Sequence, residues 1–350
     1  MNLSLEKASG VNLGCPVCTK SDATSFRRAY DDRYGQPSLF TLIRCRHCQH
    51  VMTSPRLQES ELGALYSTYY PRKHVDVGEL KNNALRSVMS LARLKRWWAG
   101  TDNQGQYAVR PGELMLDVGC GSGLSLLEAK ALGADVRGIE ADPNVRRIAD
   151  ELGLIIHIGS LLDDPFSEEK FDLVVLNQVI EHVPDPSLML SCLRGRLKKG
   201  GRIVLVFPNI NSLWCRLSGD RWINWHVPYH LHHFSRNGFE RLTERMGYRV
   251  RSVRTVTPNL WTVLQVRANR IRVELGKPSS LWSVSAPTTK ENSGARQITL
   301  RRPMVQWMRS FVRRVILIGM MIPIALVNRL VDAMGLGDSV MIEIAPKETP

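Results

Sequence analysis

Short apolar runs alternate with longer amphipathic stretches through the middle of the chain. The runs fall at 114–118, 136–139, 155–158, 171–176 and 202–206, and a last one follows at 339–344. Apolar runs of this length, separated by helical stretches, are typical of parallel strands with helices on both faces of the sheet. The pattern therefore predicts a doubly wound α/β domain with a mostly parallel sheet.

Changes in composition divide the chain into four zones. Two close cysteine pairs fall in 10–55, and apolar residues recur at helical spacing in 56–105, which predicts a helical linker or cap. The α/β pattern occupies 106–257 and resumes at 339–350. Between them, 258–338 breaks the alternation and predicts a helical insertion before the last strand.

The chain is long and apolar enough for a packed core but is strongly basic. It has 350 residues, of which 43% are hydrophobic, so disorder throughout is excluded. A net charge of +14 favours an anionic partner: nucleic acid, an acidic membrane surface or a phosphorylated substrate. No apolar segment of a secretory signal follows Met1, so we expect a cytoplasmic, thiol-reducing location.

Four of the seven cysteines form two Cys-x-x-Cys pairs, Cys15 with Cys18 and Cys45 with Cys48. Four thiolates complete a tetrahedral Zn²⁺ site, and such a closed site is structural. His47 and His50 are the less favoured alternative ligands. The sequence therefore predicts an N-terminal zinc-binding knuckle.

A glycine-rich loop follows the first strand of the α/β domain. Its glycines, Gly119, Gly121 and Gly123, permit a sharp turn before a helix, and Asp117 precedes them by two positions. The spacing is not the one expected for dinucleotides, and a carboxylate would repel a pyrophosphate. The Asp117 carboxylate suits a cofactor with an ammonium group and hydroxyls instead. Glu140 ends the second strand, where it can accept hydrogen bonds from ribose hydroxyls.

Together with 177–186 after the fourth strand and 197–201 before the fifth, these landmarks resemble the class I S-adenosylmethionine-dependent methyltransferases over about 110–257. The resemblance implies a seven-stranded Rossmann-like methyltransferase fold, S-adenosylmethionine as cofactor and methyl transfer as activity. Ser160 and Leu161 stand where many relatives have an acid that contacts adenine. The cofactor-binding residues that the resemblance implies are Asp117, Gly119, Cys120, Gly121, Gly123, Glu140, Ala141, Ser160, Leu161, Asn177 and Gln178.

Histidines near the ends of the fourth and fifth strands are candidate catalytic residues. Transfer to a hydroxyl needs a general base, and neutral histidine is available near pH 7. We single out His182, His230 and His233; the last two lie in 228–235, a segment similar to one in a methyltransferase subgroup, where it lies by the acceptor pocket. His182 could instead cap a turn, and Ser235 is expected to cap the next helix. No carboxylate or cysteine accompanies the four histidines of 226–233 at regular ligand spacing, so no metal is expected there.

A basic and apolar segment lies in the insertion. Five arginines fall in 301–314 beside Trp307 and Phe311, and uncharged residues follow from 315 to 327. This stretch is shorter than a membrane span. It fits a helix lying on an anionic membrane, which would place the protein peripherally at the inner face. A helical hairpin packed on the protein or on a partner copy is the alternative.

The sequence favours methylation of a sugar or another cell-envelope or lipid-linked intermediate, at oxygen, nitrogen or carbon. This expectation rests on the knuckle and on Ser54, Pro55, Arg56, Tyr69 and Tyr70, which resemble bacterial methyltransferases of sugar and cell-envelope pathways. An RNA methyltransferase is a second interpretation, since a zinc knuckle and basic charge could bind phosphates. It is disfavoured because no N-P-P-Y-type motif follows the fourth strand. A non-catalytic cofactor-binding or assembly protein is a third.

Overall fold

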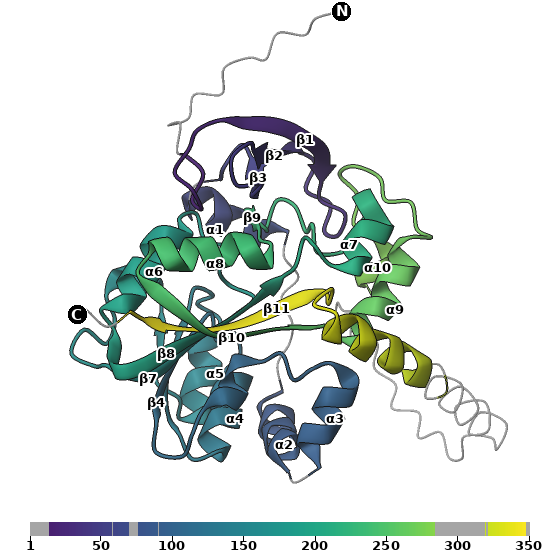
Figure 1. The fold of residues 1–350 in the computed structure, drawn as a ribbon. Coiled ribbons are helices and arrows are strands. Elements are labelled where there is room, and N and C mark those ends of the chain that lie inside the picture. Colours follow the sequence, from purple (N-terminus) through teal and green to yellow (C-terminus); the bar gives the residue numbers. More distant parts are fainter. Residues whose placement is uncertain are drawn as a thin grey trace, which may run out of the picture.

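The computed structural model describes residues 14–57, 59–69, 76–89, 91–283, 319 and 321–347. These residues form a seven-stranded and a four-stranded sheet. In Figure 1 the larger sheet crosses the middle of the molecule and the smaller one lies above it. The glycine loop and His182 follow strands of the larger sheet, whereas His233 lies in the smaller one and the cysteine pairs lie in and beside it.

The larger sheet has the predicted class. Its order is β10-β11-β8-β7-β4-β5-β6, and the neighbours from β8 to β6 are parallel. The parallel strands are β4 (Leu114–Val118), β5 (Asp135–Glu140), β6 (Ile156–Ile158), β7 (Phe171–Asn177) and β8 (Leu197–Pro208). Strand β11 (Ser339–Pro346) runs antiparallel between β8 and β10 (Tyr248–Val256). The prediction of a seven-stranded, mostly parallel sheet is confirmed.

Helices cover both faces of this sheet (Figure 1). On one side lie α2 (Val77–Val88), α3 (Ala92–Ala99), α4 (Leu124–Ala131) and α5 (Val145–Leu152); on the other lie α6 (Pro186–Arg194) and α8 (Arg236–Arg245). Alternate residues of one strand enter different cores, because successive side chains point to opposite faces. Leu116 packs with the α6 and α8 side, whereas Met115 packs with the α4 and α5 side.

The smaller sheet joins the N-terminal unit to the rest of the chain. It contains β1 (Ala23–Tyr30), β2 (Leu39–Cys45), β3 (Val51–Ser54) and β9 (His232–His233), all antiparallel. Strand β9 comes from the segment after β8, and it pairs with β3. Helix α1 (Glu59–Thr68) packs beside it, with Leu62 and Leu65 against Tyr229 and Leu231. The N-terminal unit is therefore held over the carboxyl edge of the larger sheet.

The described parts of the insertion between β10 and β11 contain helices and, over 269–279, turns and irregular backbone. The helices are α9 (Asn259–Ala268), α10 (Ser280–Ser283) and one over 321–333. The remaining short elements are η1 (Gly105–Ala108), η2 (Leu161–Asp163), α7 (Leu213–Ser218) and η3 (Gly219–Arg221). The arginines of 301–314 lie outside the described residues. Within the described ranges, no helix has both the length and the apolar character that a membrane crossing needs.

Candidate active site

The glycine loop turns sharply between β4 and α4. Gly119, Gly121 and Gly123 all have positive φ, at 74°, 54° and 84°. A Cβ on Gly119 would lie 2.5 Å from Val179 Cγ2, and one on Gly123 would lie 2.7 Å from Leu154 Cδ1. Glycine is required at both positions because backbone conformation and space each exclude a side chain. The loop is thus shaped for close approach of a ligand to the backbone.

Two carboxylates flank this loop. Glu140 Oε2 accepts a hydrogen bond from the Gly121 amide at 2.8 Å, and Oε1 accepts one from the Asp142 amide at 3.0 Å. Asp117 is 2% exposed; its Oδ2 accepts from the Ser125 hydroxyl, while Oδ1 has no hydrogen-bond partner among the described residues. Burial raises the pKa of Asp117 to about 7, and the Glu140 charge adds to the rise. A bound cation beside Asp117 would offset the free-energy cost of burying its charged form.

The other predicted cofactor residues surround the loop at the same edge of the sheet. Ser160 caps η2, accepting from the Leu162 amide at 3.2 Å, and Leu161 is buried in the core. Asn177, at the end of β7, accepts from the Gly105 amide at 2.8 Å. Gln178 has a φ of 56°, and its buried Nε2 has no partner in the described part of the chain. Cys120 is buried and Ala141 exposed.

The structure brings together two of the three candidate catalytic histidines, with a carboxylate that the sequence analysis missed. One ligand atom each of Glu181, His182 and His230 lies within 4.8 Å of the others, and the two imidazole rings are 4.7 Å apart. We call these three residues the Glu181 cluster. Glu181 precedes His182 in the chain and shares its loop after β7, but the sequence analysis did not link it to the histidines of 226–233.

Hydrogen bonding fixes the tautomer of both histidines. His182 Nδ1 lies 2.9 Å from the Tyr229 carbonyl oxygen and 3.0 Å from the Tyr66 hydroxyl, and His230 Nδ1 lies 2.9 Å from the Asn224 carbonyl oxygen. A carbonyl only accepts, so each Nδ1 carries the proton and each Nε2 keeps its lone pair. Burial lowers the pKa of His182 to about 4 and that of His230 far below its usual value. Both are therefore neutral bases at pH 7.

Glu181 is a buried carboxyl with an unusual environment. It is 1% exposed, and neither side-chain oxygen has a hydrogen-bond partner among the described residues. Burial raises the pKa of Glu181 to about 8. Its backbone carbonyl accepts from the amides of Leu231 and His232, which holds the His230 segment against the loop after β7. Two imidazoles and one carboxylate can relay a proton, and they are also a donor set that divalent transition metals accept.

His233, the third candidate, lies outside the Glu181 cluster. It belongs to β9, its Nε2 is 3.3 Å from the Thr53 hydroxyl, and its ring centroid is 6.3 Å from that of His230. Its contact with Thr53 joins β9 to β3 within the smaller sheet. The predicted cap is confirmed, because the Ser235 side chain accepts from the Gly238 amide at the start of α8.

The four paired cysteines converge at one point of the N-terminal unit. Cys15 Sγ is 3.4 Å from Cys48 Sγ, Cys18 Sγ is 3.5 Å from Cys45 Sγ, and all four sulfurs lie within 4.8 Å of one another. Zinc–sulfur bonds of about 2.3 Å require sulfurs about 3.8 Å apart at a tetrahedral ion. Hydrogen bonding from Cys48, and from the amides of Val17 and Cys18, lowers the pKa of Cys15 to about 5 against the effect of burial. The four sulfurs fit a zinc ion.

A family model described as "Methyltransferase domain" matches residues 93–253. This part of the chain is therefore similar to methyltransferase domains. The match begins in α3 and ends in β10, so it covers the glycine loop and the Glu181 cluster. It leaves out the N-terminal unit and most of the insertion.

Relatives of this domain have been named in other organisms. The chain is 35% identical over 130 residues to a ubiquinone biosynthesis O-methyltransferase of Cereibacter sphaeroides, covering 35% of this chain and 53% of the relative. It is 27% identical over 146 residues to the protein of that name in Paraburkholderia phymatum, covering 39% and 62%. The chain thus spans between half and two thirds of the length of these relatives.

Solved methyltransferase structures have lower similarity. A putative methyltransferase solved in complex with the Haloferax volcanii Trm112 methyltransferase activator has 15% identity and a TM-score of 0.43, with coverage of 78% and 98%. A putative sarcosine dimethylglycine methyltransferase from Galdieria sulphuraria has 14% identity and a TM-score of 0.41, with coverage of 72% and 84%.

The segment that matches the methyltransferase model also contains a network of side-chain hydrogen bonds that the sequence analysis did not identify. Asn177 Nδ2 donates to Gln106 Oε1 at 2.9 Å, and Gln106 and Tyr107 both donate to Glu128 of α4, at 2.6 and 2.9 Å. These bonds fasten η1 to α4 and to the end of β7. Because these bonds join residues far apart in the chain, no local sequence pattern predicts them.

Proposed function

We propose that this protein transfers a methyl group from S-adenosylmethionine to a hydroxyl oxygen of an acceptor bound beside His182. The observation that supports this most directly is one shared edge of the sheet, with the acid-flanked glycine loop after β4 and a neutral, lone-pair-bearing His182 after β7. Ligands of open α/β sheets bind at this edge. The names of the curated relatives also favour oxygen as the methylated atom.

In this proposal the cofactor-binding residues act by charge and hydrogen bonding. Asp117 would pair with the ammonium group, because its buried Oδ1 has no partner within the described residues. Glu140 would accept from the ribose hydroxyls, since its two oxygens are already oriented by backbone amides. The loop backbone, with Ala141, Ser160, Leu161, Asn177 and Gln178, would line the remainder of the cofactor site.

Methyl transfer would proceed by in-line displacement at the methyl carbon. The acceptor oxygen forms the new bond to carbon, the carbon–sulfur electron pair returns to sulfur, and His182 Nε2 takes the hydroxyl proton. The new imidazolium is poorly solvated, and an ionised Glu181 would stabilise it. Because burial raises the pKa of Glu181 to about 8, this stabilisation would increase as the pH rises towards 8. His230 would keep the cluster closed to water.

We propose a sugar or another cell-envelope or lipid-linked intermediate as the acceptor, and Zn²⁺ on Cys15, Cys18, Cys45 and Cys48 as a structural ion. The N-terminal unit supports this because β3 and α1 lie against the segment that contains His230. A zinc ion there would fix a unit that forms one wall of the acceptor site. Its role is positional, because four sulfurs leave no open coordination site.

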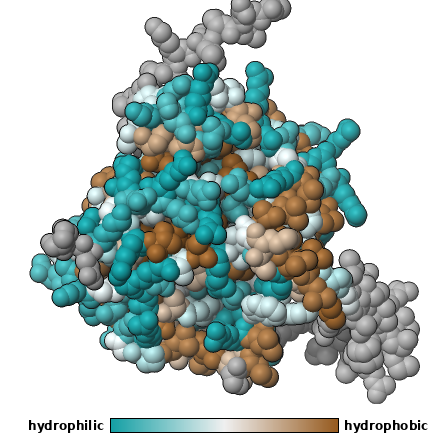
Figure 2. Space-filling view, in the orientation of Figure 1, coloured by the Kyte–Doolittle hydropathy of each residue, from teal (hydrophilic) through white to brown (hydrophobic). Residues whose placement is uncertain are grey.

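A peripheral contact with an anionic membrane is part of the proposal. Exposed apolar side chains occur along 321–334 and on α9, and Figure 2 shows an apolar area over this side of the molecule. The most exposed are Leu260, Leu326, Val327, Leu330 and Met334. The protein should co-sediment with vesicles containing anionic lipid, and removal of 301–335 should abolish this. No sedimentation of the full chain would refute the membrane contact.

The experiment that tests the function follows the methyl group. The protein is incubated with a cell extract and methyl-labelled S-adenosylmethionine, and the extract is separated into lipid, glycan, nucleic acid and small molecules. Label in lipid or glycan that disappears with Asp117→Ala supports the proposal. Label in RNA would favour the RNA methyltransferase, and no label above the variant's background would favour a non-catalytic cofactor-binding protein.

A further inference from the structure

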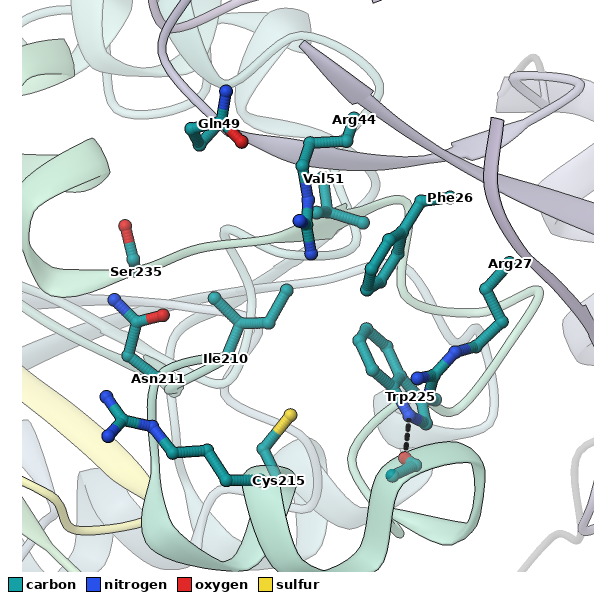
Figure 3. Close-up of a pocket in the computed structure, with 12 residues that line it drawn as sticks. Phe26, Arg27, Arg44, Gln49, Val51, Ile210, Asn211, Cys215, Trp225 and Ser235 are labelled. Atoms are coloured by element: carbon teal, nitrogen blue, oxygen red, sulfur yellow. Dashed lines mark hydrogen bonds between the residues drawn. The ribbon is translucent and has the colours of Figure 1, made fainter. Parts of the chain in front are cut away.

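A cavity lies between the N-terminal unit and the segments that follow β8, away from the glycine loop. Its volume is about 360 Å³, within the range of ligand pockets. Its walls come from β1, β2, the loop after β8 and α7. Figure 3 shows Arg44 extending from β2 into the middle of this space, with Phe26 and Trp225 on one side and Asn211 and Ser235 on the other. We call it the arginine cavity.

Three guanidinium groups from three elements line this cavity. They belong to Arg27 on β1, Arg44 on β2 and Arg216 on α7, and no carboxylate occurs among the described lining residues. Arg27 pairs with the exposed Asp220 at 2.7 Å, whereas no ion pair is found for Arg44 or Arg216 within the described part of the chain. Positive charge in the cavity therefore exceeds the negative charge beside it.

The three arginines surround the buried Cys215 thiol. Burial and the charge of Asp338 raise the pKa of this thiol to about 12, and the charges of all three arginines lower it. Arg44 stacks over the Phe26 ring with its guanidinium carbon 3.7 Å from the centroid, and Arg27 lies 5.1 Å from the Trp225 centroid. Arg44 Nε and Arg27 Nη1 are buried donors without a hydrogen-bond partner among the described residues. Stacking fixes both groups, and the Arg44 charge has no ion-pair partner among the described residues.

The arginine cavity lies at the same sheet edge as the proposed reaction site. Its residues Ile210 and Asn211 directly follow β8, and its Trp225 ring is 5.0 Å from the His233 ring. His233 in turn is 6.3 Å from His230, the neighbour of His182. A row of rings thus separates the cavity from the Glu181 cluster. A molecule whose anionic end lies in the cavity would have to pass beside these rings to bring a hydroxyl to His182.

We propose that the arginine cavity binds a phosphate or diphosphate group of the acceptor, which makes the methyl acceptor a phosphate ester or diphosphate-linked molecule. This inference rests on the proposed function, because the cavity serves the acceptor of that reaction. Guanidinium groups pair with phosphate through two parallel hydrogen bonds. Three of them from separate elements match a group with several anionic oxygens, which a neutral sugar or phenol does not provide.

Calorimetry with inorganic pyrophosphate tests the cavity on the full zinc-loaded chain. Wild-type protein should bind pyrophosphate with a sub-millimolar Kd at low salt, and Arg44→Gln and Arg216→Gln should each weaken it about tenfold or more. Arg28→Gln is the matched control, because Arg28 is an exposed arginine of β1 that does not line the cavity. It should change the Kd less than twofold. Adenosylhomocysteine is titrated in parallel and should bind all four proteins equally.

Each outcome separates the two proposals. Normal adenosylhomocysteine binding without pyrophosphate binding would overturn the arginine cavity and leave the methyltransferase proposal standing. If wild-type protein did not bind adenosylhomocysteine, the proposed methyltransferase function itself would be refuted. Equal weakening by Arg28→Gln would mean diffuse surface attraction and would also overturn the cavity. Uridine diphosphate and farnesyl diphosphate then identify the source: whichever binds tighter than pyrophosphate indicates a nucleotide-linked or a lipid-linked acceptor.

Discussion

Replacing Asp117 by asparagine should stabilise the protein and weaken its cofactor binding at the same time. The buried carboxyl has a pKa of about 7 in the folded chain against an ordinary 3.8. Between these values the folded state holds more protons than the unfolded state, so folding stability falls as pH rises, and the loss is complete above pH 7. Three pKa units correspond to about 4 kcal/mol.

Asparagine keeps the shape of Asp117 and can still accept from Ser125, but it titrates in neither state. The variant's advantage in unfolding free energy should therefore grow by about 2 kcal/mol between pH 5.5 and pH 8, at about 1.4 kcal/mol per pH unit up to pH 7. Urea unfolding of both proteins at several pH values measures this difference. Asp135→Asn is the control, because Asp135 is exposed at the start of β5.

Although Asp117→Asn should be more stable than wild type, its affinity for adenosylhomocysteine should be lower. Loss of the charged hydrogen bond to the ammonium group should weaken binding by about 1–3 kcal/mol. Wild-type affinity should also rise from pH 6 to pH 8 as Asp117 ionises, and this dependence should vanish in Asp117→Asn. A stability difference that does not vary with pH, or a variant that binds as well as wild type, would refute this account of the acid.

Three further substitutions test separate parts of the site. Glu140→Ala should weaken adenosylhomocysteine binding by about 1–3 kcal/mol in calorimetry, through loss of the ribose contacts; unchanged affinity would remove Glu140 from the site. Cys45→Ser should lose about one equivalent of zinc by mass spectrometry and unfold at lower temperature, whereas Cys192→Ser should keep the metal. Retention of zinc by Cys45→Ser would contradict the four-sulfur site. His182→Gln should lower kcat about 10²- to 10⁴-fold on the labelled acceptor while adenosylhomocysteine affinity stays within about twofold; a normal kcat would exclude His182 as the base.

Sequence patterns located the centre of the fold but not its margins. Strands β4 and β7 and most of β8 were predictable because both of their faces are buried and their residues form apolar runs. Strand β10 was not, because Arg249, Arg251 and Arg254 interrupt it and much of the strand is exposed. The same holds for β1, whose two arginines stand beside each other. Strand β9 has two residues, too few for any periodicity.

The site residues that lie close together in the chain were predictable, and those that only the tertiary fold brings together were not. The glycine loop and Glu140 lie within one βαβ unit, so their spacing in the chain fixes their spacing in the fold. Glu181 was overlooked because a single acid beside a histidine has no local signature; its meaning depends on His230, brought close by the pairing of β9 with β3. The three arginines of the arginine cavity come from different elements, and only the tertiary fold assembles them.

The central claim is that the acid-flanked loop binds a sulfonium nucleoside and not a dinucleotide. The most direct measurement is calorimetry of wild-type protein with adenosylhomocysteine and with NADH under identical conditions. The account predicts saturable binding of adenosylhomocysteine and no heat with NADH. Saturable binding of NADH together with no response to adenosylhomocysteine would contradict it.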